Sequence, residues 1–80
     1  MMTVSIQTLL LSLHALAKER RAVGAKLDSG EFADEDLDEL NDDIDRLTQA
    51  IGELGVLYEP QREGQEQIYP SVEKLLASYD

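Results

Sequence analysis

Hydrophobic residues recur at alternating steps of three and four along the first third of the chain. One position of this row is charged, because Arg20 stands where an apolar side chain is expected. Such steps bring side chains onto one face of a helix, so the row predicts a helix over about residues 4–28. Thr3 or Ser5 can cap its start, and Gly30 suits the left-handed position after its end. The apolar members of the row are Ile6, Leu9, Leu13, Leu16, Val23 and Leu27.

A second row continues without interruption and predicts a helix over about residues 34–58. Asp34 is a suitable N-cap, and the acidic residues that follow it favour the positive end of the helix dipole. Pro60 is expected to end this helix, because the residue before a proline is disfavoured in the helical conformation. The row consists of Leu37, Leu40, Ile44, Leu47, Ile51, Leu54 and Tyr58.

The end of the chain combines a polar segment with a short apolar stripe. Residues 59–69 show no hydrophobic period, so we expect a linker there. Residues 71–79 predict a short helix with apolar side chains at positions i, i+3, i+4 and i+7. A helix of about ten residues is marginal alone in water and must therefore pack on another part of the protein. The stripe consists of Val72, Leu75, Leu76 and Tyr79.

The two long rows fit together as an antiparallel hairpin. The predicted connection, residues 29–33, is short, and short connections join antiparallel neighbours. Pairing the members of the two rows in opposite directions gives residue numbers that sum to 63 or 64 throughout, so one register satisfies both rows. In this register Ile44 faces Arg20 and should be buried by both helices. Arg20 then needs an acidic partner, for which Asp43 or Asp45 is available.

The predicted fold is therefore all-α, with residues 1–80 as a single small domain. It consists of a long, coiled-coil-like antiparallel hairpin and a short C-terminal helix. A chain of 80 residues buries a modest core, and Leu10, Leu11, Ala15 and Val56 lie outside the hairpin row without a cover. The third helix, a second copy of the chain, or both together can cover them. We expect a homodimer that forms a four-helix bundle.

Charge is concentrated in the middle of the chain. The protein has 17 acidic and 7 basic residues, a net charge of −10, which differs from the basic surface of ordinary nucleic-acid-binding proteins. Residues 18–46 include 11 acids and 5 bases, and we expect the bases of the first helix to face the acids of the second. The remaining net charge of −6 favours a basic partner. The acidic candidates for that contact are Asp36, Asp38, Glu39 and Asp42.

No pattern of catalytic or cofactor-binding residues is present in the sequence. The chain has no cysteine, and its single histidine, His14, is not part of the Glu-x-x-His pattern of carboxylate-bridged metal sites. The acidic run lacks the mid-loop glycine of a calcium-binding loop. We therefore expect no catalytic residue, no cofactor and no metal, and we do not expect an enzyme.

The longest uncharged run, residues 1–17, does not fit the pattern of a membrane or targeting segment. Polar residues such as Ser5, Gln7 and His14 interrupt it, and it is shorter than the ~20 apolar residues that cross a bilayer. Its positive charges follow the apolar stretch, whereas those of a signal peptide precede it. We therefore expect no membrane association and a cytoplasmic location.

These observations favour a non-catalytic, small acidic module that binds proteins through helical packing and an acidic face. Adaptors, secretion chaperones, immunity proteins and inhibitors belong to this class. The expected partners are a second copy of the chain and an unidentified, basic protein, with no direct contact to nucleic acid. The alternative is an acidic nucleic-acid mimic that blocks a nucleic-acid-binding protein. Salt distinguishes the two, because contacts that imitate phosphates weaken steeply as salt is added.

Overall fold

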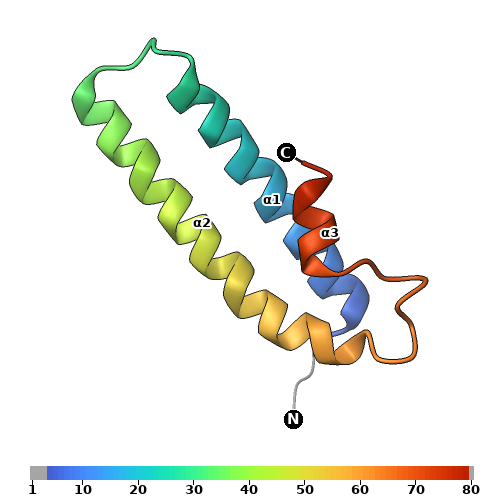
Figure 1. Ribbon diagram of the computed structural model, residues 1–80. Helices are drawn as coiled ribbons and strands as arrows, with labels where there is room; N and C mark the ends of the chain where they lie inside the picture. Colours follow the sequence, from blue (N-terminus) through green and yellow to red (C-terminus); the bar gives the residue numbers. More distant parts are fainter. Residues whose placement is uncertain (1–3, 80) are drawn as a thin grey trace.

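The computed structural model describes residues 4–79, and all regular elements in that range are helices. Figure 1 shows α1 (Ile6–Asp28) and α2 (Asp34–Gln61) side by side and antiparallel, with α3 (Val72–Ala77) folded back beside α1. The described chain is elongated, with extents of 47 × 28 × 14 Å. The prediction of an all-α hairpin with a short third helix is confirmed.

Two of the helices begin at serine caps. The Ser5 Oγ accepts a hydrogen bond from the Thr8 amide at 3.2 Å, and the Ser71 Oγ accepts one from the Lys74 amide at 3.1 Å. Each bond satisfies a backbone N–H that has no partner within the first helical turn. Of the two caps predicted for α1, Ser5 is the one observed, and Thr3 lies outside the described residues.

The start of α2 differs from the prediction. Ala33 occupies the N-cap position in an extended conformation without a side-chain hydrogen bond, so the assignment of Asp34 as the cap is wrong. Asp34, Glu35 and Asp36 instead fill the first turn, where carboxylates interact favourably with the exposed helix amides. In the preceding loop Gly30 has φ 71°, within the left-handed region that favours glycine, as the sequence predicts.

The end of α2 also differs, because Pro60 lies inside the helix. A proline disrupts a helix by removing an amide donor and by crowding the carbonyl four residues earlier. Only Gln61 follows it within α2, and the Gln61 side chain donates to the Leu57 carbonyl at 3.2 Å. The Arg62 amide then donates to the Glu59 carbonyl three residues back, which tightens the last turn. The predicted end at residue 58 is therefore too early, and α2 ends at Gln61, one residue after the proline.

The buried core lies where α3 covers the hairpin, and we call this part the three-helix end (residues 6–17 and 48–79). Leu13 and Tyr58 are each 0% exposed there, and α3 contributes Leu75 at 2%. Leu10 and Leu76 are half-buried and pack against this core. The buried residues of the three-helix end are Leu9, Leu13, Ala17, Ile51, Gly55, Tyr58 and Leu75.

The rest of the hairpin, which we call the two-helix end (residues 18–47), is only half closed. Val23 is its one buried residue. Ile44, expected to be enclosed by both helices, is half-buried. Two helices cover each other along one strip only, and α3 ends before the loop that joins α1 to α2 (Figure 1). The half-buried apolar side chains of this end are Leu27, Leu37, Leu40, Ile44 and Leu47.

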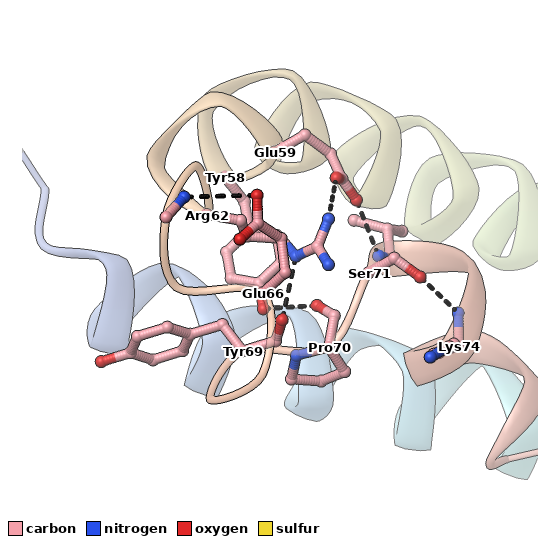
Figure 2. Close-up of polar contacts among 10 residues, drawn as sticks. Tyr58, Glu59, Arg62, Glu66, Tyr69, Pro70, Ser71 and Lys74 are labelled. Carbon is pink, nitrogen blue, oxygen red and sulfur yellow. Dashed lines mark hydrogen bonds and ion pairs between the residues drawn. The ribbon is translucent and has the colours of Figure 1, made fainter.

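A polar network attaches α3 to the end of α2, as Figure 2 shows. The Glu59 carboxylate accepts hydrogen bonds from the Arg62 guanidinium at 2.7 Å and from the Val72 amide at 2.8 Å. The Arg62 Nε donates to the Tyr69 carbonyl at 3.0 Å. The hydrogen bond from Val72, together with the Arg62 contact, holds the pKa of Glu59 below its ordinary value of 4.5. Glu59 therefore joins the two helices in its ionised form.

Two tyrosines add further links to this arrangement. The Tyr58 hydroxyl donates to the Pro70 carbonyl at 2.6 Å, and burial raises the pKa of Tyr58, so the hydroxyl remains a donor at neutral pH. At the other end of α3, the Tyr79 hydroxyl lies 2.8 Å from Nδ1 of His14, with the two rings edge to face. The single histidine therefore helps to hold α3 against α1.

The expected pairing of charges between the two long helices is not observed. Within residues 4–79 the ion pairs are Arg46 with Asp43 and Arg62 with Glu59, and each joins residues three apart along the chain. Arg20 is half-buried and forms neither of the ion pairs expected with Asp43 or Asp45. It lines hollows on the side of α3, whereas Asp43 lines hollows that contain no residue of α3. The acidic excess of the two-helix end is consequently presented to solvent.

Candidate protein-binding groove

The three apolar candidates do not form one surface. Leu10 is half-buried and packs against the core, to which α3 contributes Leu75. Leu11 is 71% exposed, and Ala15, one turn later, is also exposed. Val4, which precedes the Ser5 cap of α1, is 49% exposed. Residues four apart share a side of a helix, so Leu11 and Ala15 belong to an outward-facing apolar strip of α1.

The four acidic candidates are all exposed on α2, at the opposite end of the hairpin from Leu11. Their helical positions separate them into two pairs. Asp36 and Glu39 line a hollow beside the loop, whereas Asp38 and Asp42 do not line it. The structure therefore does not bring the acidic and apolar candidates together, and only one acidic pair borders a concave surface.

This concave surface consists of two adjoining hollows at the two-helix end, which share Asp43. The hollow beside the loop has a volume of about 260 Å³, and the hollow between α1 and α2 has a volume of about 340 Å³. We call the two together the acid-rimmed groove. It is lined by Glu19, Val23, Phe32, Asp36, Glu39, Leu40, Asp43, Arg46 and Leu47.

Four apolar side chains lie at intervals along this groove. Val23 is buried, Leu40 and Leu47 are half-buried, and Phe32, the only phenylalanine of the chain, is 37% exposed. Each of the last three keeps apolar area in contact with water, which a partner could cover. The groove thus offers a discontinuous apolar surface with an aromatic side chain near the loop.

Carboxylates outnumber bases around the same groove. Glu19, Asp36, Glu39 and Asp43 contribute four negative charges, and Arg46 contributes the one positive charge. The Arg46 guanidinium lies 3.4 Å from an Asp43 oxygen, but its side chain is 76% exposed, so this pair is weak and easily rearranged. Apolar surface beside excess carboxylate favours a ligand that is both cationic and partly apolar.

Another hollow, which lies outside the acid-rimmed groove, between α2 and α3, differs in its charge. It has a volume of about 470 Å³ and is lined mainly by apolar residues, including Ile51, Val56 and Val72. Arg20 and Glu59 are its charged residues, one of each sign. It therefore lacks the excess of one charge that would select a class of partner, and the acid-rimmed groove is the better-defined candidate.

The sequence did not predict a place in a binding site for four residues of the groove, namely Glu19, Val23, Phe32 and Arg46. Phe32 stands in the loop, outside both hydrophobic rows, and Val23 and Leu47 were assigned only to the hairpin core. A signal was nevertheless present, since residues 36, 39, 40, 43 and 47 recur at steps of three, one, three and four. Such a spacing marks a mixed acidic and apolar strip along one side of a helix.

Residues 4–79 contain neither a group of metal-ligating side chains nor a membrane-spanning helix. No three His, Asp or Glu side chains in residues 4–79 gather closely enough to hold a metal ion. None of the helices described combines the length and the apolar character needed to cross a lipid bilayer. Comparison with known proteins adds no assignment: no protein-family model, curated protein or solved structure matches the chain.

Proposed function

We propose that this protein is a non-catalytic, acidic protein-binding module of the cytoplasm, of the adaptor, chaperone, immunity or inhibitor type. It holds a basic partner at its two-helix end and places no catalytic chemistry there. The observation that carries the proposal is the combination of half-buried apolar side chains with a carboxylate rim in one groove, on the part of the hairpin that α3 leaves uncovered.

The charge and the packing support this proposal together. Residues 18–47 carry a net charge of −6, and the acids of α2 form no ion pair with α1 in the described range. Such a surface speeds association with a positively charged protein. Burial of the apolar side chains of the acid-rimmed groove then adds favourable binding free energy, which salt does not screen.

The test is a salt titration of the natural complex. The immobilised full chain captures its partner from the source cells, and the purified partner is then titrated at increasing sodium chloride concentration. We expect the affinity to fall at first and then to level off, because apolar contacts persist when charges are screened. An affinity that falls continuously with the logarithm of salt, together with displacement of the chain by DNA or RNA, would contradict the proposal and indicate a nucleic-acid mimic.

Self-association is a separate part of the proposal and rests on the outer strip of α1. Leu11 is 71% exposed although it lies in a helix whose other side forms the core, and Ala15, one turn later on the same strip, is also exposed. We propose that two copies pack these strips together as a four-helix bundle. A dimer leaves the acid-rimmed groove accessible, because Leu11 lies at the three-helix end.

Sedimentation equilibrium tests the dimer directly. The wild-type chain should sediment at twice 8.9 kDa at micromolar concentration, and Leu11→Glu should sediment as the monomer. Val56→Glu is the matched control, since Val56 is 74% exposed but lies on α2. A wild-type species of 8.9 kDa at high concentration contradicts the proposal, and so does a dimer that Val56→Glu alone disrupts.

A further inference from the structure

We infer that the acid-rimmed groove binds an amphipathic helix rich in Lys and Arg, supplied by the partner. The inference rests on the proposed function and names the kind of segment that the partner presents. It depends on three features of the groove, namely its helical walls, its length and the distribution of its charges.

The walls of the groove favour a helix over an extended segment. Its hollows lie beside helices whose backbone hydrogen bonds are made within each helix, so no strand edge is available to pair with an extended peptide. The same hairpin already accepts a short helix at its other end, where α3 presents Val72, Leu75 and Leu76 to the core. A helix from a partner would cover the two-helix end as α3 covers the three-helix end.

The length of the groove sets the length of the segment. Along α2 the lining residues extend from Asp36 to Leu47, which corresponds to roughly 16 Å at the rise of an α-helix. A partner helix of about three turns matches this span. Its apolar stripe would contact Phe32 near the loop and Leu47 at the inner end.

The charges of the rim set the chemistry of the flanks. Asp36 and Glu39 border the groove near the loop, so basic residues are required at that end of the partner helix. Arg46 borders the inner end and would repel a basic residue placed beside it. Substitutions at the rim should therefore change the affinity in opposite directions. Loss of its acids should weaken binding, and charge reversal at Arg46 should strengthen it.

Synthetic peptides provide the probe. The first is a peptide of about 16 residues, long enough to form a helix, with Leu at i, i+3, i+4 and i+7 and with Lys and Arg on both sides of the stripe. The second has the same composition in a permuted order that removes the stripe. Binding of each to the full-length protein is measured by calorimetry. We expect the permuted peptide to bind at least about tenfold more weakly, because it cannot bury its leucines together.

Equal binding of the two peptides would overturn the inference, because net charge alone would then account for the interaction. Circular dichroism of the bound state gives a second criterion. The first peptide should gain helix on binding, whereas a peptide that binds without gaining helix contradicts the proposed mode.

Matched variants test the position of the bound helix. Asp36→Asn with Glu39→Gln removes two charges from the rim, and Asp38→Asn with Asp42→Asn removes two charges from the same helix outside the groove. The first pair should weaken binding of the striped peptide about fivefold to tenfold, and the second pair by less than about twofold. Equal losses would mean that the peptide responds to the whole acidic helix, and this result would overturn the assignment to the groove.

Arg46→Glu gives a test by gain of affinity. The Arg46 side chain is 76% exposed, so the substitution should leave the fold intact, as circular dichroism can verify. Binding of the striped peptide should strengthen by about fivefold, because one repulsive charge becomes attractive. Unchanged or weaker binding by a folded Arg46→Glu variant contradicts the inferred position.

These results separate the inference from the proposed function. Suppose that both double variants weaken binding of the purified natural partner while the striped peptide does not bind. The proposed function as an acidic binding module then stands, and the inference that the partner presents a helix is overturned. If neither double variant changes the affinity of the natural partner, the acidic end is not the binding surface and the proposed function fails as well.

Discussion

The three-helix end and the two-helix end are built from the same two rows of apolar residues, yet they differ in how well those rows are buried. Leu13, in the first row, is 0% exposed where α3 is present. Leu40, in the second row, is only half-buried near the loop, where α3 is absent. The hydrophobic pattern runs through both ends and is interrupted once, at Arg20 in the two-helix end. The residues of the rows that pack with α3 include a closed core, whereas most row members at the two-helix end remain half-buried.

The charged residues also have different roles at the three-helix end and at the two-helix end. At the three-helix end, Glu59 and Arg62 engage the backbone that leads into α3, so their charges serve the fold. At the two-helix end, Asp36 and Glu39 are exposed beside a groove and hold no other element in place. The three-helix end therefore holds the fold together, and the two-helix end is the one to which we assign recognition in the proposed function.

The largest effect should come from truncating the same residue type at each end. Leu13→Ala leaves a cavity in a closed core and should lower the free energy of unfolding by about 3–5 kcal/mol, whereas Leu40→Ala removes a half-buried side chain and should cost about 1–2 kcal/mol. Urea denaturation of both variants measures the difference. Equal losses would show that the two-helix end is as closed as the three-helix end.

A pH titration should detect the carboxylate that fixes α3. The pKa of Glu59 is lowered in the folded state, so its contribution to stability is present above its ordinary value of 4.5 and is lost as the pH falls through the folded value. Thermal melts of the wild type and of Glu59→Gln should therefore differ most at neutral pH and converge in acid. A difference between the two proteins that does not change with pH would contradict this role.

Glycine substitutions should report where α3 packs closely. A Cβ at Gly24 or Gly52 would meet no other atom within 4 Å, so Gly24→Ala and Gly52→Ala should each stabilise the helix by about 0.5–1 kcal/mol. A Cβ at Gly55 would lie 3.4 Å from Cγ2 of Val72, so Gly55→Ala should gain less or nothing. If Gly55→Ala is as stabilising as the other two, α3 does not press on α2 at this point.

The smallest effect concerns repulsion at the two-helix end. Asp38 and Asp42 lie one helical turn apart, and like charges at this spacing destabilise a helix by a few tenths of a kcal/mol. Asp38→Asn with Asp42→Asn should raise the melting temperature slightly at low salt, and the gain should disappear as salt is added. Glu53→Gln, at the three-helix end, serves as the control and should show no such salt-dependent gain.

The fold was predictable because two heptad rows of compatible register leave few arrangements other than a hairpin. The Ser5 cap, one of two candidates, and Gly30 were also predicted, since each depends on local chemistry. The end of α2 was not, because the bias of the residue before a proline against the helical conformation is a tendency, and Glu59 remains helical here.

The candidate site was only partly predictable. The sequence identified Asp36 and Glu39, but grouped them with Asp38 and Asp42, which lie outside the groove. Separating the pairs requires knowing which side of α2 faces a concavity. The expected pairing of Arg20 with an acid was wrong for a related reason, since partner choice depends on the direction of side chains around two helices rather than on register alone.

Hydrogen exchange of the backbone amides, with and without the striped peptide, tests the division between the two ends most directly. In the free protein, amides within residues 22–47 should exchange faster than those of residues 9–17 and 51–58, because fewer buried contacts oppose local opening. The peptide should slow exchange within residues 22–47 and leave the three-helix end unchanged. Equal protection of both ends in the free protein, or protection gained around α3 instead, would contradict the account.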